Sequence, residues 1–149
     1  MAAEDGRLRR LLRANLAELI LVAEAQVVLV RCQLAKAVQP VGSLVGADVK
    51  GPEDGDPASV RAASEVGWAV TRAARFGLFR PQCLVRSLAI QRMLKRRHIA
   101  GSQLRIGVRI ADGRMVAHAW VELCGAVIGD SAQNVSSFTP APNLRMVQL

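Results

Sequence analysis

The stretch that decides the fold runs from Pro81 to Leu94 and reads PQCLVRSLAIQRML. Its apolar residues recur at helical spacing, and Pro81 precedes the run, where a missing backbone N–H costs little. The predicted helix therefore begins at Cys83. A thiol in the first turn lies near unpaired N–H groups and the positive end of the helix dipole, which favour thiolate. Cys83 is a candidate nucleophile, although a cysteine packed in an apolar core would leave the same pattern.

Two further helices are predicted upstream of this one. Residues 7–38 carry apolar residues near the helical period, and residues 58–76 form a second helix that Gly77 ends, with Asp56 or Ser59 as its cap. Between them, residues 40–57 are rich in Pro, Gly and Asp and read as a loop or linker. The sequence thus predicts an N-terminal helical segment over residues 1–57 and a main domain over residues 58–149.

The pattern changes after the cysteine helix, which is predicted over residues 83–98. Residues 103–110 alternate apolar and polar, Asp112-Gly113 signals a tight hairpin, and residues 114–123 form the returning strand. A second turn at Cys124-Gly125 precedes a third strand over residues 126–130, a loop over residues 131–142 and a last strand over residues 144–148. Helices followed by an antiparallel meander predict an α+β fold.

A histidine and an aspartate lie where they can complete a catalytic set with Cys83. His118 lies in the second strand, on the same face as Trp120 and Glu122. A hairpin centred on Cys124-Gly125 pairs position 118 with about position 131, which brings Asp130 or Ser131 level with His118. A carboxylate can therefore meet the imidazole from the neighbouring strand. A thiolate, a base and a group that orients the base are what cysteine catalysis needs. Each residue alone has a structural alternative: core packing for Cys83, a half-buried imidazole for His118 and a turn for Asp130.

Composition narrows the class of function. The chain has 149 residues with a net charge of +8 and only three Phe, two Trp and no Tyr, so its core is aliphatic. Its arginine clusters fit an acidic peptide or protein better than nucleic acid, because few aromatic residues are present to stack on bases. Three scattered cysteines and no CxxC pair predict no disulfide framework and no structural metal site. Without a secretory signal, we expect a cytoplasmic protein.

The first predicted helix is apolar on much of its circumference. Glu18, Glu24, Gln26 and Arg31 interrupt the apolar run, so a core helix or a helix that docks on a partner is favoured over a membrane span. Part of its apolar surface is therefore expected to be an interface. Membrane association is not expected, although the sequence does not exclude it.

Three blocks of the sequence resemble one family. CLVRSLA from Cys83, IGVR from Ile106 and AHAWVE from Ala117, with Gly125 and Asp130, are similar to the leader peptidases of lasso-peptide biosynthesis. These B proteins are transglutaminase-like cysteine peptidases with a papain- or transglutaminase-like fold, in which an antiparallel sheet packs on the cysteine helix. The resemblance covers about residues 58–142. It implies that Cys83 is the nucleophile, His118 the base and Asp130 its orienter.

The resemblance also implies partners. Residues 1–57 lack the strand-rich pattern of the leader-recognition domain that some members carry, so the chain resembles the stand-alone peptidase. Its expected partners are the precursor leader peptide, a separate leader-binding protein and the lasso cyclase, with no cofactor. The backbone N–H of Cys83 is the expected oxyanion donor, Gln82 a second candidate, and Trp120 either walls the substrate groove, shields His118 or packs in the core. A transglutaminase or deamidase, or a non-catalytic scaffold in the same assembly, remains the alternative.

Overall fold

The computed structural model describes residues 2–38 and 56–140, with side chains from residue 15 onward in the first of these segments. Helices come first and a small antiparallel sheet follows, which confirms the predicted α+β class. Residues 40–55 of the loop predicted over residues 40–57, and the strand predicted over residues 144–148, lie outside the described residues. The elements in chain order are α1 (Ala2–Val38), α3 (Pro57–Phe76), α4 (Cys83–Arg96), β1 (Gln103–Ala111), β2 (Arg114–Leu123), β3 (Ala126–Ile128), α5 (Ala132–Val135) and β4 (Thr139–Pro140).

The sheet has the strand order β3-β2-β1-β4, and all its neighbouring strands run antiparallel. The tight turn at Asp112-Gly113 joins β1 to β2, and the turn at Cys124-Gly125 joins β2 to β3, as the sequence predicts. Val121 pairs with Ile128. Counting two residues outward from this pair on each strand places Asp130 level with Ala119, which is next to His118. The predicted hairpin register is therefore correct.

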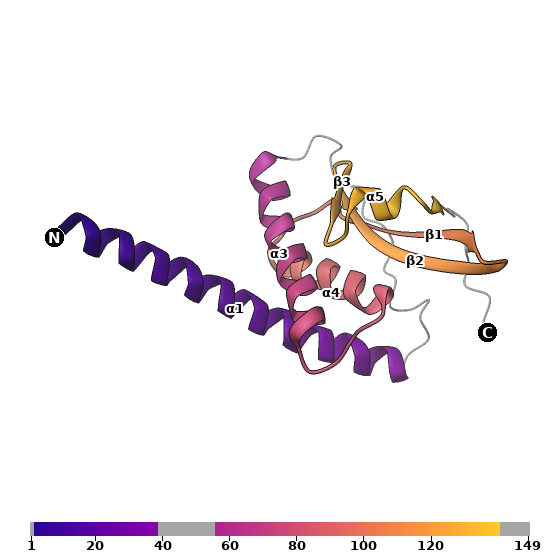
Figure 1. Cartoon of the computed structure of the whole chain (residues 1–149), viewed down its shortest axis with the longest axis horizontal. Helices are drawn as coiled ribbons and strands as arrows, with labels where there is room; N and C mark the ends of the chain where they lie inside the picture. Colours follow the sequence, from indigo (N-terminus) through magenta and orange to yellow (C-terminus); the bar gives the residue numbers. More distant parts are fainter. Residues whose placement is uncertain (1, 39–55, 141–149) are drawn as a thin grey trace.

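The two sides of the sheet pack against different layers. The side that carries Val121 and Leu123 joins the aliphatic core formed with α1, α3 and α4, whereas Trp120 packs with Val135 and Phe138 in a separate small cluster. Figure 1 shows α4 below β2 and α5 above it, while the N-terminal part of α1 projects away from the body. Residues next to one another along β2 therefore belong to two different clusters.

Capping residues set the two ends of α3. Asp56 is the N-cap of α3 and accepts a hydrogen bond from the Ala58 N–H, Pro57 occupies the first turn, and the Gly77 N–H donates to the Ala73 carbonyl at the other end. The helix α1 begins at Ala2, earlier than the predicted residue 7. Within residues 2–38 and 56–140, no helix combines the length and the apolar character that crossing a bilayer demands.

Two predictions for the C-terminal part are wrong in detail. The third strand ends at Ile128 rather than Asp130, because Gly129 has a φ of 76° and turns the chain out of the sheet. The segment predicted as a loop contains α5 and β4. Ser131 caps α5 by accepting a hydrogen bond from the Asn134 N–H, and β4 adds to the sheet through Gly107 and Val108 of β1.

The C-terminal half of α1 packs into the same core as the other helices. Its buried residues Ala25, Val28, Leu29 and Cys32 contact the core formed by α3 and α4. At the surface, Glu24 of α1 forms an ion pair with Arg97 at the end of α4, with 2.6 Å between Oε2 and Nη2. This half of α1 is therefore part of the folded unit, while the division into two domains at residue 57 stays a prediction.

Replacing Glu24 with glutamine is expected to destabilise the protein at neutral pH only. Hydrogen bonding from Arg97 lowers the pKa of Glu24, with burial opposing the shift. A carboxyl group whose pKa is lowered by folding stabilises the protein above its unfolded pKa, and this stabilisation disappears as pH falls through the folded pKa. We expect Glu24→Gln to cost about 1–3 kcal/mol at neutral pH.

Urea unfolding at neutral pH and at acidic pH measures this dependence. The deficit of Glu24→Gln should shrink once the pH falls below about 4, where an unperturbed glutamate takes up a proton. Glu65→Gln is the matched control, because Glu65 forms only an exposed i,i+4 pair with Arg61. An equal deficit at both pH values would contradict the assignment of this stability to the Glu24 charge.

Candidate active site

Cys83 is the first residue of α4 and is half-buried. Gln82 precedes it with an extended backbone, and the first helical hydrogen bond runs from the Arg86 N–H to the Gln82 carbonyl at 3.1 Å. The N–H groups of Cys83 and of the two residues after it therefore have no acceptor within the helix. These N–H groups are therefore available to an acceptor at the start of α4, the end of the helix that carries Cys83.

A buried serine fixes this helix to the strand that carries the histidine. Ser87 is almost fully buried, and its hydroxyl donates a 3.0 Å hydrogen bond to the carbonyl of Ala119 in β2. Ala119 directly follows His118. Cys83 lies one helical turn before Ser87, a rise of about 6 Å along the axis. This contact holds the N-terminal end of α4 against the part of β2 that carries His118.

His118 and Asp130 form a short hydrogen bond, with 2.6 Å between Nε2 and Oδ2. Both side chains are mostly buried, with 16% and 19% of their surfaces exposed. Because the bond uses Nε2, the other ring nitrogen, Nδ1, is the atom that can exchange a proton with a nucleophile. The structure thus brings together two of the three predicted catalytic residues.

Two aromatic rings hold the imidazole in place. Trp120 stacks beside the His118 ring with 6.1 Å between centroids, and Phe138 stacks at 5.0 Å. Trp120 is 2% exposed, and its indole N–H donates to Glu122 at 2.8 Å. This position fits two of the predicted roles for Trp120, packing in the core and shielding of the histidine. Phe138 was not predicted, because it lies in a segment that reads as a loop.

The thiol is the third predicted member of the set. Among the residues that the structure describes, no hydrogen bond joins Cys83 to His118. The imidazole lies on the face of β2 that carries Trp120, whereas α4 packs under the face that carries Val121. The nucleophile and the base therefore come from two layers that the Ser87 contact holds together.

Asp130 is held in its ionised form. Burial alone would raise the pKa of Asp130, but hydrogen bonds from His118, from the Ser131 N–H and from the Asn134 side chain outweigh burial and lower it. The Ser131 N–H lies 2.7 Å from Oδ1, and the Asn134 amide lies 3.1 and 3.2 Å from the two oxygens. The negative carboxylate fixes the tautomer and the orientation of the His118 ring.

Sequence reasoning did not find Asn134. It lies in α5, inside the stretch that was predicted as a loop. A signal was present: Ser131 is a strongly preferred N-cap residue, and it directly follows Asp130. An N-cap at Ser131 predicts a short helix after it, and one turn of that helix places Asn134 next to the Asp130 carboxylate.

The carbonyl of Gly129 fixes the position of Asp130. It accepts hydrogen bonds from the Thr71 hydroxyl of α3 at 3.0 Å and from the Arg86 guanidinium of α4 at 3.1 Å. Arg86 lies three residues after Cys83 in α4. The helix that begins with the candidate nucleophile therefore also binds the turn before Asp130. The carboxylate is positioned by contacts to two helices that lie far from it in the sequence.

Gly67 permits the close approach of α3 to this turn. A Cβ at residue 67 would lie 2.6 Å from the backbone nitrogen of Gly129 and 2.9 Å from its Cα. We expect Gly67→Ala to displace the residue before Asp130 and to destabilise the protein by about 1–3 kcal/mol. Ser64→Ala, an exposed change one turn away in the same helix, should leave stability nearly unchanged.

Heteronuclear NMR of the His118 ring, together with chemical unfolding, tests this expectation. The chemical shifts of the His118 ring nitrogens should move in Gly67→Ala, because its hydrogen-bond partner Asp130 is displaced, and should stay unchanged in Ser64→Ala. A Gly67→Ala protein with unaltered stability and an unaltered His118 signal would show that α3 does not set the position of Asp130.

The remaining residues that the sequence singles out make contacts of their own. The Gln82 side chain is exposed, and its Oε1 accepts a hydrogen bond from Lys36 of α1. Glu122 pairs with Arg105 at 3.3 Å. Cys32 is fully buried, and burial raises the pKa of its thiol, whereas Cys124 lies exposed in a turn. Within the described segments, no group of three His, Cys, Asp or Glu side chains is placed to hold a metal ion.

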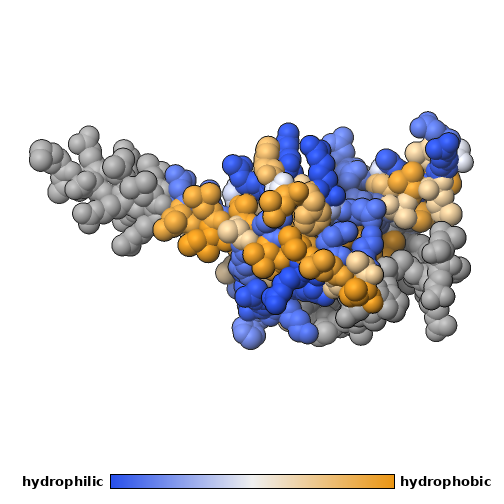
Figure 2. Space-filling view, turned by 90° about the horizontal axis from the view of Figure 1, so that it is seen from below, coloured by the Kyte–Doolittle hydropathy of each residue, from blue (hydrophilic) through white to orange (hydrophobic). Residues whose placement is uncertain are grey.

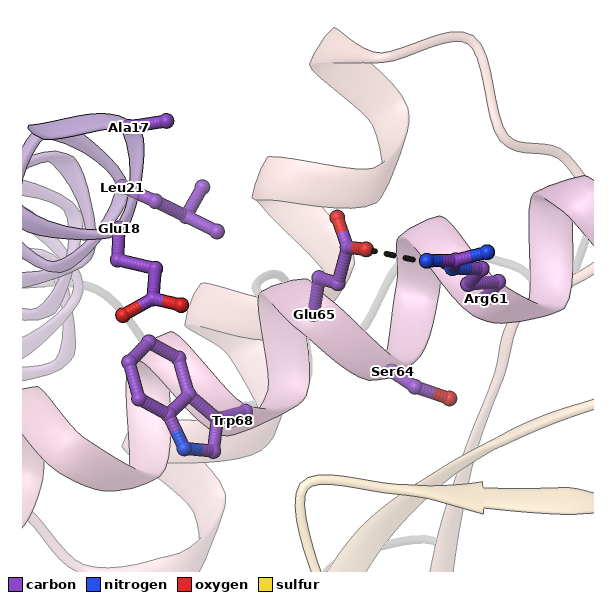
Figure 3. Close-up of a pocket in the computed structure, with 7 residues that line it drawn as sticks. All are labelled: Ala17, Glu18, Leu21, Arg61, Ser64, Glu65 and Trp68. Atoms are coloured by element: carbon purple, nitrogen blue, oxygen red, sulfur yellow. Dashed lines mark ion pairs between the residues drawn. The ribbon is translucent and has the colours of Figure 1, made fainter. Parts of the chain in front are cut away.

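A cleft lies between α1 and α3, away from these residues. Figure 3 shows Trp68 and Glu65 of α3 facing Glu18 and Leu21 of α1, with Arg61 paired to Glu65. None of its lining residues is a predicted site residue. The cleft does not contain the chemistry of the candidate site.

Comparison with known proteins identifies one family. The sequence profile of the transglutaminase-like superfamily matches residues 26–143, which include Cys83, His118 and Asp130. No curated protein and no solved structure gives a significant match. The match supports a function of the cysteine peptidase or transglutaminase type. Because it covers most of the sequence, the chain belongs to the transglutaminase-like superfamily.

Proposed function

We propose that the protein is a cysteine peptidase that removes the leader from a ribosomally made lasso-peptide precursor. The observation that carries the proposal is the 2.6 Å hydrogen bond between His118 and Asp130, on a strand held against the helix that begins with Cys83. Membership of the transglutaminase-like superfamily supports the chemistry. The resemblance of the blocks at Cys83 and Ala117 to the lasso-peptide leader peptidases supports the substrate.

The mechanism starts with proton transfer from the Cys83 thiol to Nδ1 of His118. The thiolate attacks the carbonyl carbon of the last leader residue, and the oxyanion accepts a hydrogen bond from the Cys83 backbone N–H. The amide of Gln82 supplies the second donor, because only its oxygen is engaged by Lys36. His118 then returns the proton to the leaving amine, which becomes the new N-terminus of the core peptide. Water attacks the thioester, releases the leader carboxylate and regenerates the thiol.

The proposed assembly contains three partners. A separate leader-binding protein presents the precursor leader to the peptidase, and an ATP-using cyclase closes the ring on the released core peptide. Of these steps, the chain itself performs only hydrolysis, for which the proposed residues need no metal or cofactor. Because recognition resides in another protein, we expect the isolated chain to bind the leader weakly.

Cleavage of a lasso-peptide precursor with and without its leader-binding protein tests the proposal. Mass spectrometry should find two fragments whose masses sum to the precursor plus one water, with faster cleavage when the leader-binding protein is present. Products that gain an amine or lose ammonia from a glutamine would instead identify a transglutaminase or deamidase. An intact precursor in the presence of all partners would leave the non-catalytic scaffold as the remaining function.

A further inference from the structure

The strand β2 has an open edge beside the helix that begins with Cys83. On one side, β1 pairs with β2 from end to end, whereas on the other side β3 pairs only with residues 121–123. Among the described residues, residues 114–120 therefore have no neighbouring strand on that side. Unpaired main-chain groups along an exposed strand form a template for another extended chain. This edge is a candidate binding site for such a chain.

The turns on either side of β2 identify the main-chain groups that face the open edge. Asp112-Gly113 and Cys124-Gly125 are two-residue turns, and all four residues have a positive φ. In such hairpins the residues that flank the turn exchange two hydrogen bonds, and the direction of the main-chain groups alternates from there along the strand. The N–H and C=O groups of the even-numbered residues of β2 therefore point to β1. Those of Met115, Ala117 and Ala119 point to the open edge.

The hydrogen bond from Ser87 shows the same direction and relates the nucleophile to the edge. Ser87 donates to the Ala119 carbonyl, so the edge faces α4 at this residue. Figure 1 shows that α4 and β2 run the same way, from the hairpin end of the molecule toward β3. Cys83 precedes Ser87 by about 6 Å along the helix, which corresponds to about two residues of a strand. Cys83 is therefore about level with Ala117, on the open side of β2.

The outward main-chain groups of Met115 and Ala117 are accessible. Met115 is 72% exposed and Ala117 is also exposed, and Figure 2 shows apolar surface at the hairpin end of the molecule, at the right of the view. Within residues 2–38 and 56–140, no hydrogen bond from outside the sheet engages the main chain of either residue. Alanines flank His118 on both sides, and their small side chains leave room beside the strand.

The same edge lacks the usual barriers to an added strand. Exposed edges are commonly protected by proline, lysine or a bulge. Residues 115–119 of β2 contain neither proline nor lysine, and their pairing with β1 proceeds residue by residue without a bulge. An extended chain can therefore pair with β2 next to His118.

We propose that the peptide to be cut binds as an added strand on the open edge of β2, where its main chain exchanges hydrogen bonds with Ala117 and Met115. The inference rests on the proposed peptidase function and gives it a mode of substrate recognition. An added strand brings the peptide main chain to the space that Cys83 and His118 border. Because the contacts are made to main chain, the site takes extended segments and excludes helices and folded domains, whose main-chain groups are already paired.

A proline on the edge is the first test. Ala117→Pro removes the outward N–H and places a ring on the edge, but it removes no hydrogen bond to β1. We expect precursor cleavage to lose about 10-fold or more in kcat/KM, with an unchanged circular dichroism spectrum. Ile110→Pro is the matched control, because Ile110 is 73% exposed and its main chain faces the opposite edge of the sheet, and it should cleave normally. Normal cleavage by Ala117→Pro would overturn the proposal.

Ester substitution in the precursor tests the same contacts without changing the protein. Each amide N–H near the cut, apart from that of the scissile bond, is replaced in turn by an ester oxygen. Because only every second residue of an added strand faces its neighbour, kcat/KM should fall at alternate positions. A precursor series in which every ester is cleaved as fast as the amide would overturn main-chain recognition.

Amide hydrogen exchange followed by NMR separates this inference from the proposed function. The Cys83→Ala protein is mixed with the leader-binding protein, with and without the precursor. The precursor should slow exchange at Met115 and Ala117 but not at Ile110. This protection without any cleavage by the wild-type protein would reject the peptidase function and keep the binding edge. Precursor binding that leaves both amides unprotected would overturn the added strand. Protection that instead rises with protein concentration alone would also overturn it, by assigning the edge to a second copy of the chain.

Discussion

Cys83→Ala is expected to abolish leader removal while leaving the protein folded. Alanine is at least as good a helix former as cysteine, and residue 83 is half-buried at the start of α4, so little packing is lost. Without the thiol, no thioester can form. The loss should reach about 10⁴-fold or more, as it does when the nucleophile of a catalytic triad is removed. Mass spectrometry of a precursor digest and circular dichroism of the variant measure the two expectations.

Two comparisons make the Cys83 result specific. Cys124→Ser changes another cysteine, one that is exposed in the turn between β2 and β3, and should keep full activity. In the wild-type protein, a small alkylating reagent should modify Cys83 far faster than Cys32, because Cys32 is fully buried and burial raises the pKa of its thiol. Normal cleavage by Cys83→Ala would eliminate the thioester mechanism.

Asp130→Asn is expected to produce the second-largest loss, about 10⁴-fold in kcat with little change in KM. The amide keeps the size of the carboxylate but not its charge, so it no longer fixes the tautomer of His118 or stabilises the imidazolium. Hydrogen bonds from His118, Ser131 and Asn134 to the carboxylate hold the pKa of Asp130 low against the effect of burial, which is the interaction that the change removes. Steady-state kinetics of precursor cleavage separates kcat from KM.

The graded control for this prediction is Asn134→Ala. It removes the 3.1 and 3.2 Å hydrogen bonds to the Asp130 oxygens but leaves the charge and the bond to His118. A smaller loss than in Asp130→Asn is therefore expected. Asp56→Asn, which alters the cap of α3, should not affect the rate. An Asp130→Asn enzyme with the wild-type kcat would mean that another group orients His118.

Local patterns were enough to predict the order of the elements from α1 to β3, and to bring residues 130 and 131 level with His118. The period of the apolar residues distinguishes helices from strands, and two tight turns fix which residues of adjacent strands are level. Both signals act over a few residues, so the sequence displays them directly. The register of β2 and β3 follows from the position of the turn at Cys124-Gly125 alone, and the structure shows the same register.

Contacts between distant segments were not predictable in the same way. The Gly129 carbonyl accepts hydrogen bonds from Thr71 and Arg86, although Gly129 lies more than 40 residues later in the sequence than either of them. Gly67 reads as an unfavourable residue within a helix, and only the packed structure shows that the turn needs its missing Cβ. The aromatic ring of Phe138 likewise reaches His118 only because β4 pairs with β1.

The two hydrogen bonds to the Gly129 carbonyl determine when, during synthesis of the chain, Asp130 can reach its position. The carboxylate takes its place only after Thr71, Arg86 and the turn that follows β3 have met, and these segments leave the ribosome in that order. A half-synthesised chain thus exposes a cysteine but has no oriented base beside it. The proposed catalytic set is therefore complete only after the turn that follows β3 has been synthesised.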